Sequence, residues 1–151
     1  MHSKKGKITN CFSSDNEDGG VYFAPELTVE IKKGNLLINY DHGRYGSWKY
    51  TFRYQKNNFE LIGYDTYIRD HTSGQLVEKL ISINFLTQKM QTKTSITDMV
   101  DDREVEIENT EHWQDFKLTA PVTLTNIFMD TYLLNFDEVP PNAFAAQGIK
   151  W

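Results

Sequence analysis

The stretch WKYTFRYQKNNFELIGYD, residues 48–65, alternates large and polar side chains, breaks the pattern at two asparagines and then resumes it. Alternation with a period of two is typical of a half-buried β-strand. One face of the first strand carries four aromatic side chains, Trp48, Tyr50, Phe52 and Tyr54. Asn57-Asn58 suits a two-residue turn, because asparagine tolerates positive φ. The stretch therefore predicts an amphipathic hairpin with an aromatic inner face.

The predicted register pairs Tyr54 with Leu61 and Phe52 with Gly63, which places Phe59 and Leu61 on the aromatic face as well. Gly63 would then leave room for the ring of Phe52; the alternative is that Gly63 marks a bulge. The aromatic face could be an exposed platform for a sugar. Because Phe59 and Leu61 join it, we favour the core of a sheet instead.

The same period of two continues on both sides of this hairpin. Further strands are expected at LTVEIKKGNLLINY (27–40, two strands), YDTYIRDH (64–71), LVEKLISINFL (76–86), KMQTKTSI (89–96) and REVEIEN (103–109). Turns are expected at 72–74 and 87–88. Sequential short strands with turns at these intervals predict a mainly β fold, a single-domain antiparallel meander that is either a curved sheet or sandwich-like, with little helix. Whether the strands close on themselves stays open.

Composition fits one domain. The chain has 151 residues, of which 39% are hydrophobic and 13% aromatic, which is core material that a disordered chain lacks. Residues 1–20 are expected to be a flexible N-terminal arm, and residues 21–151 a single β-rich domain. The net charge of −5 and the lack of a basic face argue against a nucleic-acid partner. No apolar run approaches the roughly 20 residues that span a bilayer.

Two stretches, WKYTFRYQKNNFELIGYD and SINFLTQKMQT (82–92), together resemble a pattern in uncharacterised bacterial proteins, many of them exported or periplasmic. That pattern has an aromatic strand ending in Phe-Arg-Tyr-Gln, a strand carrying Leu-Ile-Gly, and Asn-Phe/Tyr-Leu-Thr before a Gly-Lys turn. It covers about residues 34–93, and this chain departs from it at Gln88, where the pattern prefers glycine. The resemblance implies a β-rich domain exported to the periplasm or cell envelope, with a cytoplasmic location as the alternative. It transfers no catalytic residues.

No catalytic constellation stands out. The histidines, at positions 2, 42, 71 and 112, do not have the spacing of a zinc site with one another or with the single cysteine, Cys11. The sequence contains no Gly-x-Ser-x-Gly and no glycine-rich phosphate loop. We therefore predict no catalytic residues and no obligatory cofactor.

An acidic stretch, Asp98–Asp115, holds eight acids and only Arg103 in opposition. Calcium prefers several oxygen ligands at close range, and four carboxylates are candidate ligands: Asp98, Asp101, Asp102 and Glu104. The alternative is a solvated loop followed by a strand with outward glutamates. We favour this alternative, because charge runs are usually exposed.

The candidate ligand-binding residues are tyrosines and one arginine beside predicted loops, which we expect to be exposed: Tyr40, Arg44, Tyr45, Tyr64 and Tyr67. Loops carry binding function more often than scaffolds do.

Three functions stay open. The absence of a catalytic constellation favours a non-enzymatic, exported or envelope-associated module that binds a protein or glycan partner. A carboxylate-dependent glycan hydrolase would require two of the 21 acids to converge. An acidic cytoplasmic inhibitor or immunity-type protein would meet a basic partner through residues 104–115, and salt would weaken that binding.

Overall fold

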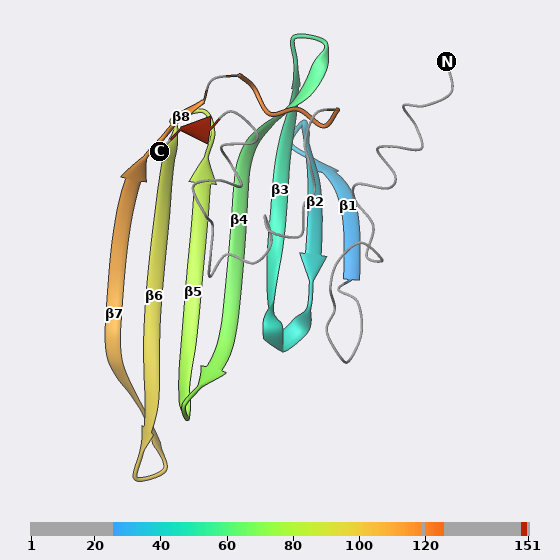
Figure 1. The fold of residues 1–151 in the computed structure, drawn as a ribbon. Coiled ribbons are helices and arrows are strands. Elements are labelled where there is room, and N and C mark those ends of the chain that lie inside the picture. Colours follow the sequence, from blue (N-terminus) through green and yellow to red (C-terminus); the bar gives the residue numbers. More distant parts are fainter. Residues whose placement is uncertain (1–25, 119, 126–148, 151) are drawn as a thin grey trace.

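The computed structural model describes residues 26–118, 120–125 and 149–150. Seven of its strands form one antiparallel sheet in chain order (Figure 1). They are β1 (Glu26–Lys32), β2 (Asn35–Asp41), β3 (Gly46–Gln55), β4 (Asn58–Thr72), β5 (Gln75–Asn84), β6 (Lys89–Val100) and β7 (Arg103–Asp115). A two-stranded sheet joins β8 (Lys117–Leu118) to β9 (Ile149–Lys150). The mainly β meander is thus confirmed, and β1 and β7 are the two edges of an open sheet.

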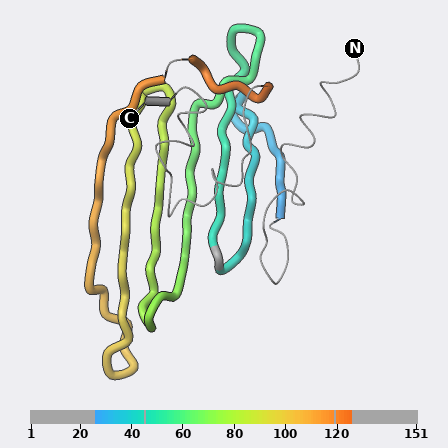
Figure 2. Tube along the Cα trace, in the orientation of Figure 1, coloured from blue at the N-terminus to red at the C-terminus, as the bar shows by residue number. Residues whose placement is uncertain are grey.

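Helix is confined, within the described ranges, to the single 3₁₀ turn η2 (Gly43–Tyr45) between β2 and β3. The predicted N-terminal arm, residues 1–20, lies outside the described residues. Figure 2 traces the meander from β1 to β7 and shows the short segment after β7 passing over the strand ends.

Four of the hairpins share one kind of turn. Two residues, both with positive φ, join β1 to β2, β3 to β4, β4 to β5 and β6 to β7: they are Lys33-Gly34, Lys56-Asn57, Ser73-Gly74 and Asp101-Asp102. Positive φ at both positions defines the turn whose twist matches that of the flanking strands. Short connections of this kind pair each strand with the strands directly before and after it in the chain, which produces the meander.

The predicted register of the central hairpin is wrong by two residues. The turn is Lys56-Asn57 and not Asn57-Asn58, so Tyr54 pairs with Phe59 and Phe52 pairs with Leu61. Both registers pair even with odd positions, so Phe59 and Leu61 still join the aromatic face, as expected.

A bulge then changes the register within the same hairpin. The pairing shifts between Thr51 and Phe52, which leaves Ile62 as an extra residue and places Gly63 opposite Thr51. The alternative interpretation of Gly63 as a bulge marker is therefore the better one. Beyond the bulge Tyr64 pairs with Tyr50, because the extra residue reverses which positions of β4 face the core.

One face of the sheet, here called the apolar face, carries the core. Its buried side chains are Ile38, Tyr40, Tyr50, Phe52, Leu61, Tyr64, Ile81 and Ile83, joined by Phe85, Phe116 and Val122. Tyr50 and Tyr64 meet edge to face, with ring centroids 4.8 Å apart, a geometry that favours aromatic pairs. Of the four aromatic residues of the strand, Tyr50 and Phe52 are therefore core and Trp48 packs against it, whereas Tyr54, beside the turn, is exposed.

The segment after β7 fastens the end of the sheet near the β3–β4 turn. The Leu61 amide donates to the Val122 carbonyl at 2.8 Å, and the Leu124 amide donates to the Phe59 carbonyl at 2.9 Å. At the β5–β6 turn, Gln88 accepts from Phe116 through its main chain and from Leu118 through its side chain. Gln88 has φ +55°, which explains why a glycine suits the corresponding turn, and its side chain adds a contact that glycine lacks.

Candidate functional site

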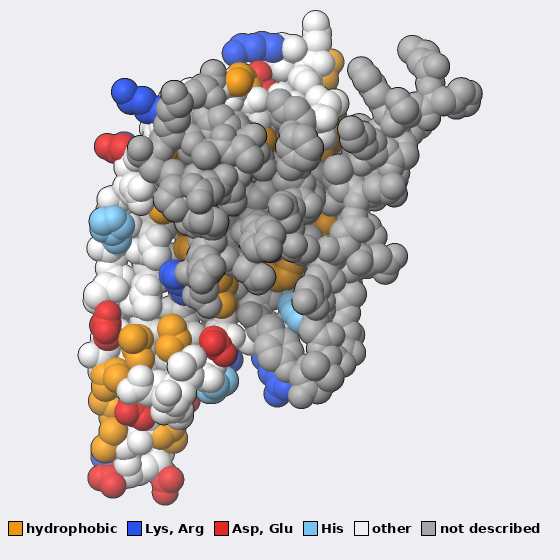
Figure 3. All heavy atoms as spheres, viewed as in Figure 1, with side chains coloured by type: hydrophobic (Ala, Val, Ile, Leu, Met, Phe, Trp, Pro, Cys, Tyr) orange, Lys and Arg blue, Asp and Glu red, His pale blue; other side chains and the backbone are white. Residues whose placement is uncertain are grey.

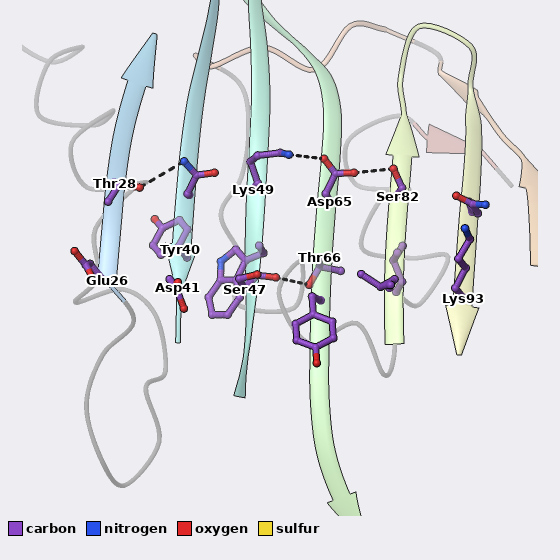
Figure 4. Close-up of a pocket in the computed structure, with 16 residues that line it drawn as sticks. Glu26, Thr28, Tyr40, Asp41, Ser47, Lys49, Asp65, Thr66, Ser82 and Lys93 are labelled. Carbon is purple, nitrogen blue, oxygen red and sulfur yellow. Dashed lines mark hydrogen bonds and ion pairs between the residues drawn. The ribbon is translucent and has the colours of Figure 1, made fainter. Parts of the chain in front are cut away.

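A groove of about 650 Å³ crosses the face opposite the apolar face, here called the polar face (Figure 4). Figures 1 and 4 view the sheet from opposite sides, since the strand order is reversed between them. One wall is a row of directly paired residues from β1 to β6: Thr28, Asn39, Lys49, Asp65, Ser82 and Gln91. The other wall is a parallel row: Glu26, Asp41, Ser47, Tyr67, Leu80 and Lys93. All twelve line the cavity, which we call the cross-strand groove.

The floor of the cross-strand groove is main chain. Between the two walls runs a third row of lining residues, Tyr40, Trp48, Thr66 and Ile81. Alternate residues of a strand point to opposite faces, so these residues send their side chains toward the core and present backbone to the groove. Tyr40 and Trp48 stack with ring centroids 5.5 Å apart, on the side of β2 and β3 that faces away from the groove.

The cross-strand groove is long and narrow. It runs across six strands, and five steps of about 4.8 Å between neighbouring strands give a length of roughly 24 Å. Both walls continue in register onto β7, where Trp113 pairs with Gln91 and Glu111 pairs with Lys93. This shape fits an extended ligand better than a compact one.

Hydrogen bonds hold the first wall in place. Lys49 Nζ lies 3.1 Å from Asp65 Oδ2, and Ser82 Oγ donates to Asp65 Oδ1 at 2.7 Å (Figure 4). Asn39 Nδ2 donates to Thr28 Oγ1 at 3.4 Å. Lys49 and Asp65 are about half exposed, so solvent screens their attraction and the pair mainly fixes geometry.

Tyr67 is anchored from outside the groove. Its hydroxyl donates to Glu78 Oε1, and Arg69 Nε lies 3.7 Å from the same oxygen. The hydrogen bond to Glu78, followed by burial, raises the pKa of Tyr67 above its ordinary value. The ring is therefore kept neutral and in one orientation beside the groove.

Trp113 stands at the β7 end of the first wall with 57% of its surface exposed. Its Nε1 donates to Glu111 Oε1 at 2.9 Å, and Gln91 Nε2 donates to the same oxygen. The hydrogen bonds from Gln91 and then from Trp113 lower the pKa of Glu111. An exposed indole with a fixed direction is a suitable surface for a ligand to pack on.

The structure places the predicted ligand-binding residues in different environments, and not all of them lie at the groove. Tyr67 lines the cross-strand groove. The expectation that Tyr40 and Tyr64 are exposed is wrong, since they are 0% and 2% exposed: Tyr40 alternates in phase with Ile38, and the bulge turns Tyr64 inward. Arg44 is exposed in η2, outside the lining of the groove, and the side chain of Tyr45 lies outside the described part.

The candidate calcium ligands lie around the β6–β7 turn. Asp101 and Asp102 form that turn, Asp98 accepts hydrogen bonds from Gln75 Nε2 and the Met99 amide, and Glu104 is exposed on β7. In the described ranges, no three His, Cys, Asp or Glu side chains are grouped so that they could hold a metal ion. Calcium binding stays a prediction.

The wall residues other than Tyr67 were missed by sequence reasoning. Each occupies an outward position of an alternating strand, and such positions are normally just solvated. Only the combined registers of five hairpins place them in two rows.

No protein-family model matches the chain, no curated protein matches it, and no solved structure matches it. The residues that the structure describes include no helix long and apolar enough to cross a membrane.

Proposed function

We propose that this protein is a non-enzymatic binding module for a linear, uncharged glycan that lies along the cross-strand groove. The observation that carries the proposal is the groove's form: roughly 24 Å of continuous polar wall above a main-chain floor. An occupant must be extended, and it must offer hydrogen-bonding groups along its whole length.

The charges of the walls support a neutral ligand. The walls contain two cations, Lys49 and Lys93, and three anions, Glu26, Asp41 and Asp65. A polyanion such as nucleic acid would gain nothing from this balance. The other polar wall residues carry hydroxyl or amide groups, which can both donate and accept hydrogen bonds, as sugar hydroxyls do.

Two aromatic rings support a sugar in particular. Sugar rings have apolar C–H faces that pack on aromatic side chains. Tyr67 lies midway along the second wall, and exposed Trp113 stands beyond the end of the first. Both rings have fixed directions, through Glu78 and Glu111 respectively, which lowers the entropy lost on binding.

Binding without cleavage is favoured by how the wall carboxylates are used. Asp65 engages one oxygen with Lys49 and the other with Ser82. Asp41 Oδ1 accepts from the Gly43 amide at 2.7 Å. These carboxylates serve to position neighbouring groups, whereas a hydrolase needs an acid and a base directed at the scissile bond.

The test is titration calorimetry with a length series of neutral oligosaccharides, namely β-glucan, xylan and chitin fragments. We expect the affinity for one series to rise with chain length until the groove is filled. Trp113→Ala should weaken binding about tenfold. Tyr54→Ala is the matched control, because Tyr54 is similarly exposed, at 59%, but lies on the apolar face.

Equal losses in the two variants, or no binding by any series, would contradict the proposal. Release of new reducing ends during the titration would favour the hydrolase hypothesis instead.

We also propose a periplasmic or cell-envelope location, supported by the resemblance to exported proteins. Fractionation of cells expressing the full-length gene would test this location.

A further inference from the structure

Within the described residues, the outer edge of β7 is open to solvent. Among the described strands, β7 pairs only with β6, and Figure 1 shows it at one side of the sheet with no strand beyond it. Twelve of its thirteen residues are exposed, Gln114 being half-buried. An edge strand presents a row of main-chain N–H and C=O groups that a further strand can pair with.

A bulge divides this edge. The pairing with β6 shifts between Ile96 and Thr97, which leaves Ile107 as an extra residue on β7. Bulges interrupt the regular ladder, so pairing of an added strand is best in the uninterrupted part, Glu108–Asp115. That part has eight residues, which is longer than the most common strand length of about 5–6 residues.

The negative charge of β7 disfavours pairing of this strand with β7 of a second copy of the chain. The strand carries five acids and one base: Glu104, Glu106, Glu108, Glu111 and Asp115 against Arg103. Figure 3 shows acidic side chains at several points along the side of the molecule where β7 lies. Pairing β7 with its own copy would bring like charges together across the strands, which destabilises a sheet. The same charges attract lysine and arginine at the opposing positions.

We propose that the Glu108–Asp115 edge of β7 binds an extended, basic segment of a partner protein as an eighth strand of the sheet. Main-chain hydrogen bonds supply affinity, and alternating side chains supply specificity. Glu111 and Asp115 lie on the polar face and Glu108 on the apolar face, as their partners on β6 show. Basic side chains on either face of the added strand therefore meet a carboxylate. The inference stands whether or not the cross-strand groove binds a glycan.

The test uses an eight-residue labelled peptide in which lysine and valine alternate, with a glutamate-for-lysine peptide as its counterpart. Fluorescence anisotropy with the full chain should show binding of the lysine peptide only, weakened about tenfold or more between 50 and 500 mM salt because exposed charges are screened. Two further lysine peptides carry N-methyl groups at odd or at even positions. An added strand uses one alternate set of N–H groups toward its partner, so only one of the two methylated peptides should lose binding.

The protein variants are Glu108→Lys with Glu111→Lys, and the matched control Glu30→Lys. Glu30 is an exposed glutamate on β1, the opposite edge. The double reversal should exchange the peptide preference, whereas the control should keep it. Binding by both methylated peptides would overturn strand addition, and equal binding of the lysine and glutamate peptides would overturn the charge selection. Absence of lysine-peptide binding, or self-association through β7 in sedimentation, would also refute the proposal. The peptide comparison needs no variant, so it holds even if the double variant folds poorly.

Discussion

Replacing Gly46 with alanine should damage both the sheet and the cross-strand groove. Gly46 has φ +129°, and a Cβ built on it would lie 2.1 Å from the carbonyl oxygen of Tyr67. That oxygen belongs to the backbone of β4, so relief of the clash must separate β3 from β4 beside a groove residue. Overpacking costs about 1–3 kcal/mol, and an unfavourable backbone conformation costs a further 1–3 kcal/mol or so. We therefore expect Gly46→Ala to lower the free energy of unfolding by the sum of these costs, about 2–6 kcal/mol.

Gly74→Ala is the matched control for this prediction. Gly74 also has positive φ, +83°, but a Cβ there would meet nothing within 4 Å. It should cost only the conformational part, about 1 kcal/mol. Urea unfolding measures both free energies, and for a chain of this size the melting temperatures should fall by about 10 °C and 3 °C respectively. Equal losses in the two variants would refute the argument from the close approach of Tyr67.

Three other changes test the core, the β5–β6 turn and the anchored tyrosine. Phe52→Ala should cost about 3–5 kcal/mol in urea unfolding, since Phe52 is 0% exposed; a loss below about 1 kcal/mol would contradict its place in the core. Gln88→Gly should change stability by less than about 0.5 kcal/mol, because relief of positive φ offsets the lost side-chain hydrogen bond. Hydrogen exchange of the Leu118 amide should nonetheless accelerate, and an unchanged rate would argue against that bond. Glu78→Gln should lower the pKa of Tyr67 toward 10. The raised pKa contributes stability that is complete below pH 10 and is lost as pH rises through the pKa of Tyr67 in the folded protein. The variant should therefore lose less stability than the original protein over that pH range. Ultraviolet titration of tyrosine measures the change in the pKa of Tyr67.

The meander could be predicted from the sequence because alternation reports burial directly. Strands with one buried face must place apolar residues at every second position, and Trp48–Tyr54 does so without a break. Turn positions could also be predicted where the sequence has a glycine, which permits positive φ, as at Gly74. The Lys56-Asn57 turn was displaced in the prediction because asparagine is the better-known residue for that conformation, whereas the structure gives lysine φ +51°.

The burial of Tyr64 could not be predicted, because it depends on the bulge. Without an extra residue, Leu61 and Gly63 would face the core and Tyr64 would face solvent. With Ile62 inserted, Leu61 and Tyr64 share the apolar face. Tyr40 is different. It alternates in phase with Leu36 and Ile38, which already indicated that its side chain faces the core. The prediction that Tyr40 is exposed gave too much weight to its position beside a loop.

The cross-strand groove was beyond sequence reasoning for a geometric reason. Lys49, Asp65 and Ser82 become neighbours only when the registers of two hairpins are both known, and a shift by one residue in either would turn one of them to the other face. The structure supplies these registers, because the short connections between strands fix how neighbouring strands pair. A function that depends on a row across strands is therefore encoded in the turns as much as in the residues of the row. The two-residue turns at Lys56-Asn57 and Ser73-Gly74, together with the bulge at Ile62, set the register that brings Lys49, Asp65 and Ser82 together. None of these turn and bulge residues lines the groove.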